Sequence, residues 1–244
     1  MKKISPNNLI FLLFIAIETV IYVVFNVLAA TGAPDPIYLK YSGVLLCLAV
    51  LFAIIFMPDR GRDNAVMLAA LFFTAISDLF ILVLDKYYEI GLVTFIIVQS
   101  IYLYRLYADR LKKIYVTLAV RLTVMLALII TFVVLGMLNL LVAECAIYIT
   151  MLVGNVADAF IICKKSVKNL IFAIGLLLFL GCDICVGLHN FGSVLNVSLP
   201  SWLISFAAFA IWAFYLPSQV LITLSVKGGL KLKKSQGVED VAEG

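Results

Sequence analysis

The fold is decided by stretches such as residues 64–84, NAVMLAALFFTAISDLFILVL, in which Asp78 is the one charged side chain. At a rise of 1.5 Å per residue, a helix of this length crosses the roughly 30 Å hydrocarbon core of a bilayer. Over the whole chain, 65% of the residues are hydrophobic and 13% are charged. That charged fraction is about half of what a soluble domain carries. We therefore expect a protein whose solvent is lipid.

The rest of the chain contains further stretches of the same kind. The eight apolar segments fall near 8–30, 37–57, 64–84, 88–107, 115–136, 138–163, 168–189 and 202–226. The tightest connection, between the fifth and sixth segments, runs from Gly136 to Asn139. Backbone groups in lipid must be satisfied within their own segment, so the spans are predicted to be helices. The sequence thus predicts an all-α membrane protein with a bundle of eight transmembrane helices over residues 1–230, followed by a short polar tail over 231–244.

The basic residues predict how these helices are oriented. Most of the 18 lysines and arginines fall on one side of the predicted membrane. The positive-inside rule places that side in the cytoplasm, which makes the chain a multi-pass protein of the cell membrane with both termini cytoplasmic. Because topology accounts for the net charge of +4, nucleic acid is not expected as a partner. The sequence does not indicate an oligomeric state.

Ionisable side chains inside the predicted spans are expensive in lipid and mark candidate functional positions. Asp78 and Asp183 each lie about 14 or 15 residues into a helix that enters from the cytoplasmic side. Glu144 is expected at a similar depth, and Lys40 lies above them at the outer end of its helix. We expect these four side chains to share one polar cavity. The alternative is that they pair only to fix the packing of the helices.

Further polar residues recur one helical turn apart and could line the same cavity. They are Gln99 and Tyr102, Tyr215 and Gln219, and Tyr148, which lies one turn from Glu144. Each could instead form a hydrogen bond between helices. Arg121 and Asp158 are predicted to form a structural ion pair near the cytoplasmic ends of their helices.

The residue types favour acid–base chemistry by carboxylates. Two carboxylates in unequal environments can divide the roles of acid and base, which suits a reaction that passes through an oxocarbenium ion. The chain has one histidine, His189, whereas hydrolytic zinc sites usually take two or three. The same histidine makes a Ser-His-Asp hydrolase a poor fit, and there is no glycine-rich phosphate loop. No metal or other cofactor is therefore expected.

At these positions the sequence resembles the YhhN family of membrane proteins, the lysoplasmalogenase family, over essentially the whole chain. Three blocks carry the resemblance: Ser77-Asp78-Leu79-Phe80 with Gly91, Phe95 and Gln99-Ser100-Ile101-Tyr102; Gly175, Phe179, Asp183 and Phe191; and Tyr215-Leu216-Pro217-Ser218-Gln219. Lys40 matches a lysine that opens the family's second helix. Many members have His where Gln99 stands and Ser where Cys182 stands.

The resemblance implies hydrolysis of the vinyl ether bond of lysoplasmalogens to a fatty aldehyde and glycerophosphoethanolamine or glycerophosphocholine. Asp78 and Asp183 would then be the catalytic residues, one of them giving a proton and the other stabilising the cation and activating water. The remaining polar residues would contact the lysophospholipid substrate: Lys40, Glu144, Tyr148, Gln99, Tyr102, Tyr215 and Gln219.

A transporter or lipid-binding protein that uses the same carboxylates is the alternative function. The first four and the last four helices run in the same directions, so they could form a parallel repeat of four plus four, as in many transporters. Against this alternative, no Gly-Pro interruption breaks a helix near the aspartates. Release of aldehyde by the purified protein would separate the two functions.

Overall fold

The computed structural model describes residues 6–56, 61–108, 111–195 and 199–226. These ranges contain eight helices that are long and apolar enough to cross a membrane, and no strand. The helices are α1 (Pro6–Ala30), α2 (Ile37–Ile55), α3 (Arg62–Asp78), α4 (Tyr88–Tyr107), α5 (Leu111–Val134), α6 (Leu140–Ile162), α7 (Val167–Leu195) and α8 (Ser201–Leu224). The predicted all-α membrane fold is confirmed, whereas the repeat of four plus four stays a prediction.

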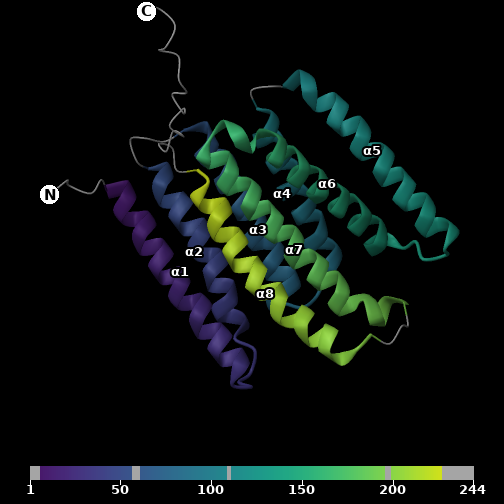
Figure 1. The fold of residues 1–244 in the computed structure, drawn as a ribbon, viewed down its shortest axis with the longest axis horizontal. Helices are drawn as coiled ribbons and strands as arrows, with labels where there is room; N and C mark the ends of the chain where they lie inside the picture. The colour runs from purple at the N-terminus through teal and green to yellow at the C-terminus, as the bar shows by residue number, and fades with distance from the viewer. Residues whose placement is uncertain (1–5, 57–60, 109–110, 196–198, 227–244) are drawn as a thin grey trace, which may run out of the picture.

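Six of the helices form a closed circuit of contacts. Each helix in the order α2, α3, α4, α6, α7, α8 packs against the next, and α8 packs back against α2. Helix α1 lies outside this circuit against α2 and α8, and α5 lies outside it, mainly against α6. Figure 1 shows α1 and α5 at opposite edges of the bundle. In the circuit α3 and α7 are three places apart, so they face one another across it.

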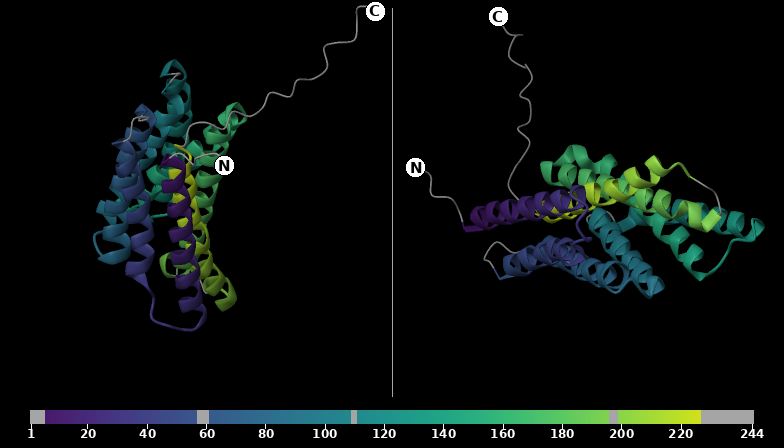
Figure 2. Two further views of the ribbon diagram at one scale, coloured as in Figure 1. Left: turned by 90° about the vertical axis from the view of Figure 1, so that its left-hand side faces the viewer. Right: turned by 90° about the horizontal axis from the view of Figure 1, so that it is seen from below.

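Figure 2 shows how these helices are layered. Seen from below in Figure 2, α1 and α8 lie in one layer and α2 and α3 in another. The aspartate-bearing helices α3 and α7 do not pack closely against each other, so their side chains approach one another across the interior of the circuit.

The first turn of α1 and the last turn of α8 lie at the same end of the bundle (Figure 1). Arg105, near the end of α4, also lies at this end, which we call the Arg105 end. Eight apolar helices indicate a multi-pass membrane protein, but the cytoplasmic location of the Arg105 end stays a prediction. Several basic residues that predict it lie outside the described residues, as do the boundary after residue 230 and the tail over 231–244.

The turn between α5 and α6 lies where the sequence predicts it, but residues 135–139 make it longer than the connection between α4 and α5. Gly136 adopts a positive φ of 68°, a left-handed conformation that suits glycine. The side chain of Asn139 then accepts a hydrogen bond from the backbone N–H of Val142 and caps α6. Because α6 begins at Leu140, Glu144 lies only about one turn from the end of the bundle opposite Arg105.

Candidate active site

Each of the two aspartates is held by one tyrosine from another helix. The hydroxyl of Tyr215 on α8 donates to Oδ2 of Asp78 on α3 over 2.5 Å. The hydroxyl of Tyr148 on α6 donates to Oδ2 of Asp183 on α7, also over 2.5 Å. Within the described residues, Oδ1 takes no hydrogen bond in either aspartate. One oxygen of each carboxyl group is therefore fixed, and the other is left for a further partner.

The two tyrosine–aspartate pairs lie close to one another. The carboxyl groups of Asp78 and Asp183 are near enough to interact electrostatically. A chain of rings joins the two tyrosines: Tyr148 contacts Phe95, Phe95 contacts Phe179, and Phe179 contacts Tyr215, each with ring centroids 5.7 Å apart. The aspartates thus share one site, bounded on one side by aromatic rings. Asp78 is 5% exposed and Asp183 is more open, so their environments are unequal.

The backbone around Asp78 has an unusual local structure. Helix α3 ends at Asp78, and the chain continues as a π-helical turn over Leu79–Val83. Such turns are frequent at functional sites. On the facing helix, a Cβ at Gly91 would lie 2.4 Å from Cγ1 of Ile81, so only glycine allows α4 to approach so closely. The hydroxyl of Ser77 donates to the carbonyl of Gly91 over 2.6 Å, which fixes the backbone next to the aspartate.

Lys40 does not contact the aspartates, although the sequence predicted that it would share their cavity. Its ammonium group forms an ion pair with Asp35, just before the start of α2, at 2.5 Å. It also lies 4.4 Å from the centroid of the Trp212 ring, and that ring contacts Tyr215. Lys40 therefore reaches the site only through two aromatic side chains, at the end opposite Arg105.

Glu144 is also displaced from the expected position. It lies one turn of α6 nearer the end opposite Arg105 than Tyr148 does, and it is 8% exposed. Its Oε2 has no hydrogen-bond partner among the described residues, and its carboxyl group interacts electrostatically with that of Glu89. The structure thus brings Asp78, Asp183, Tyr148 and Tyr215 together and leaves Glu144 at the edge of this group.

Gln99, Tyr102 and Gln219 lie on the other side of the aspartates, toward the Arg105 end, and are fully buried. The amide of Asn155, which the sequence reasoning missed, donates to the side-chain oxygen of Gln99 over 2.8 Å. Asn155 in turn accepts from Arg121. The predicted ion pair between Arg121 and Asp158 is confirmed, with a separation of 2.6 Å. This network joins α4, α5 and α6.

The comparisons with known proteins identify the family. A model of the YhhN family matches residues 36–226. The chain belongs to the YhhN family. No curated protein and no solved structure matches the chain. The matched residues run from the start of α2 to the end of α8, so they include both tyrosine–aspartate pairs.

Helix α1 precedes the residues that match the YhhN model, and it carries a further buried carboxyl group. Glu18 is 3% exposed, and the thiol of Cys47 donates to its Oε1 over 3.6 Å. A shallow pocket of about 180 Å³ beside it is lined mainly by apolar side chains of α1 and α8. Within the described part of this YhhN chain, no group of three or more His, Cys, Asp or Glu could hold a metal ion.

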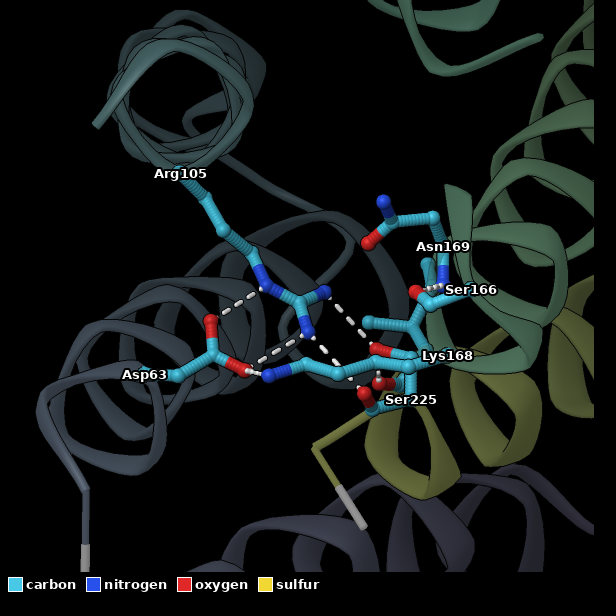
Figure 3. A network of polar contacts seen from close by, with 7 residues as sticks. Asp63, Arg105, Ser166, Lys168, Asn169 and Ser225 are labelled. Carbon is cyan, nitrogen blue, oxygen red and sulfur yellow. Dashed lines mark hydrogen bonds and ion pairs between the residues drawn. The ribbon is translucent and has the colours of Figure 1, made fainter. Parts of the chain in front are cut away.

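A cluster of charged side chains lies at the Arg105 end of the YhhN bundle (Figure 3). Nε and Nη2 of Arg105 donate to the two carboxylate oxygens of Asp63, over 2.7 and 2.9 Å. Nη1 donates to the hydroxyl of Ser225 over 2.7 Å, and Lys168 forms an ion pair with Asp63. The guanidinium also lies 4.3 Å from the centroid of the Phe172 ring. The cluster ties the ends of α3, α4, α7 and α8 together.

We expect Arg105→Gln to lower the free energy of unfolding by on the order of 3 kcal/mol, because Asp63 loses two charge-assisted hydrogen bonds and keeps only Lys168 as a charged partner. Titration of the purified protein with a denaturing detergent would measure this loss. Arg62→Gln is the matched control, since Arg62 is exposed one residue before Asp63. Equal losses in the two variants would show that the cluster does not stabilise the bundle.

Proposed function

We propose that this YhhN-family protein is a membrane hydrolase that cleaves the vinyl ether bond of lysoplasmalogens. The proposal rests chiefly on one observation, the two tyrosine-bound carboxyl groups that lie near enough to interact electrostatically inside a bundle of apolar helices. A vinyl ether is cleaved by acid, and its oxocarbenium intermediate needs a negative charge nearby. A single-chain lipid reaches such a site from the bilayer itself.

In the proposed reaction, one protonated aspartate gives its proton to the vinyl carbon that is remote from the ether oxygen. The oxocarbenium ion that forms is stabilised by the second, ionised aspartate, which takes a proton from the attacking water. The resulting hemiacetal then collapses. The ether oxygen leaves as an alcohol with the proton from the second aspartate, and the hemiacetal hydroxyl returns a proton to the first. One water is consumed, and both aspartates regain their starting states.

The tyrosines have a positioning role in this mechanism. Each hydroxyl holds Oδ2 of its aspartate, so Oδ1 would be the oxygen that gives or takes protons. Gln99, Tyr102 and Gln219 lie on the side away from Lys40 and Glu144, so they would contact water rather than the head group. Lys40 and Glu144, toward the opposite end, are suited to the phosphate and the ammonium group of the lysolipid.

Release of aldehyde by the purified protein tests this function. In detergent or lipid vesicles, 1-alkenyl lysophosphoethanolamine should yield a fatty aldehyde, whereas the 1-alkyl analogue, which has no double bond to protonate, should not react. If neither lipid is cleaved by the folded protein, the function is not the one proposed.

The transporter alternative gains one observation from the structure. Helix α3 changes to a π-helical turn directly after Asp78, and irregular helices near buried carboxyl groups are common in transporters. A transporter would move or bind the lysolipid in vesicles without releasing aldehyde. The same assay therefore separates the two functions.

We expect Glu144→Gln to raise KM for substrates with an ammonium head group and to change kcat little. The unpaired Oε2 of Glu144 would bind the ammonium, and a charge-assisted hydrogen bond contributes about 1.5–3 kcal/mol. The comparison substrate is 1-alkenyl glycerophosphate, which has no ammonium and should show an unchanged KM. An equal rise in KM for both substrates would argue against this role of Glu144.

A further inference from the structure

Four buried polar atoms between the aspartates and the Arg105 end form no well-aligned hydrogen bond among the described residues, although Thr74 lies beside Tyr102 and Cys47 lies beside Thr223. They are Nε2 of Gln99, the hydroxyl of Tyr102, Oε1 of Gln219 and the hydroxyl of Thr223. All four side chains are fully buried. A buried polar group without a partner destabilises the folded state. These atoms therefore require partners.

The four groups lie on one face of α8 and one face of α4, and both faces extend from the aspartates to the Arg105 end. On α8, Tyr215, Gln219 and Thr223 are spaced four residues apart and so lie on one face. This face begins at Asp78, which Tyr215 contacts, and ends near Ser225, which contacts Arg105. Ten residues of helix separate Tyr215 from Ser225, which is roughly 15 Å.

Helix α4 supplies the second face. Gln99, Tyr102 and Arg105 are spaced three residues apart. Tyr102 lies between the two ends of the column, because its hydroxyl is close enough to interact electrostatically with both Arg105 and Asp78. Tyr148, the partner of Asp183, also interacts with Tyr102. Helices α4 and α8 do not pack closely against each other, but buried Cys47 of α2 lies beside Thr223 and near Tyr102. The two faces therefore border one polar column that runs from the aspartate pair to the Arg105 end.

We propose that this column binds a file of water molecules that bridge Gln99, Tyr102, Gln219 and Thr223 and link the aspartates with the Arg105 end. Buried water typically makes about three hydrogen bonds to otherwise unsatisfied groups. The column offers it an amide donor from Gln99, an acceptor from Gln219 and two hydroxyls that can do both. An alternative occupant, an acyl chain, would leave all four groups unsatisfied.

The water file gives the proposed hydrolysis a route for its second substrate. The reaction consumes one water and moves protons between the two aspartates, and both can pass along a chain of hydrogen bonds. This consequence rests on the proposed function. The water-binding column does not, since the four unpaired groups exist whatever the protein cleaves.

Hydroxyl-radical footprinting by X-ray pulses on the purified wild-type protein, without substrate, tests the column. Radicals formed from bound water oxidise the side chains next to that water even where bulk solvent cannot reach. Tyr102 should be oxidised although it is fully buried, whereas Phe14, which is 1% exposed within the apolar core, should not. Tyr102 as unreactive as Phe14 would overturn the proposal.

A pair of threonine variants gives a second, independent test. Thr223→Val removes one bridging group and should lower the oxidation of Tyr102 several-fold, while Thr123→Val on the exposed face of α5 should leave it unchanged. Oxidation of Tyr102 that stays at the wild-type level in Thr223→Val would contradict the column. Failure of the aldehyde assay would leave these footprinting results intact, so the two proposals fail separately.

Discussion

Asp78→Asn and Asp183→Asn should each abolish the release of aldehyde from lysoplasmalogen while the protein stays folded. The amide keeps the shape of the side chain and can still accept from the neighbouring tyrosine, but it can neither give a carboxyl proton nor carry a negative charge. Loss of a general acid or base typically lowers the rate by about 10² to 10⁴. Initial rates with 1-alkenyl lysophosphoethanolamine, measured beside the melting temperature of each variant, would check this.

Asp85→Asn is the matched control for the two aspartate variants, because Asp85 is exposed beyond the π-helical turn that follows Asp78. Its activity should equal that of the wild type. If both aspartate variants stay folded and cleave the lipid at near wild-type rates, the carboxyl groups take no part in the reaction.

Tyr148→Phe and Tyr215→Phe should each lower kcat by about 10- to 100-fold, which corresponds to the roughly 1.5–3 kcal/mol of a hydrogen bond to a charged group. The phenylalanine keeps the ring contacts with Phe95 and Phe179 and removes only the hydroxyl. Because these tyrosines hold the aspartates rather than the lipid, KM should change little.

Tyr104→Phe is the control for the tyrosine variants, since Tyr104 is exposed on α4 and faces away from the site. A purely packing role of Tyr148 and Tyr215 would predict reduced thermal stability with an unchanged kcat in the surviving protein. That result would show that the tyrosines do not position the carboxyl groups.

The fold was predictable because a helix that crosses lipid needs about 20 consecutive apolar residues. Apolar length fixed the number of spans, and the predicted segment 37–57 differs from α2 by only two residues at its end. The ends of longer helices were less predictable. The sequence predicts that the seventh segment ends at residue 189, whereas α7 continues to Leu195, because a helix can extend beyond the apolar run that defines its span.

The aspartate pair was predictable, but its partners were not. Counting residues into each helix placed Asp78 and Asp183 at one depth. The choice of Tyr215 and Tyr148 as their partners depends on which helices pack together, and a single sequence does not contain this. The same limit explains Lys40, whose ammonium group pairs with Asp35, five residues earlier in the chain. The contacts of Arg105 with Asp63 and Ser225 likewise depend on which helix ends meet.

The central claim is that a carboxyl group protonates the vinyl ether, and cleavage in heavy water tests it most directly. The purified protein would be incubated with 1-alkenyl lysophosphoethanolamine in D₂O, and the aldehyde would be trapped at once as an oxime and analysed by mass spectrometry. We expect one deuterium at carbon 2 of the aldehyde, the former vinyl carbon remote from the ether oxygen, and no labelled product with Asp78→Asn or Asp183→Asn. Aldehyde without deuterium at carbon 2, or no aldehyde from the folded wild-type protein, would contradict this mechanism.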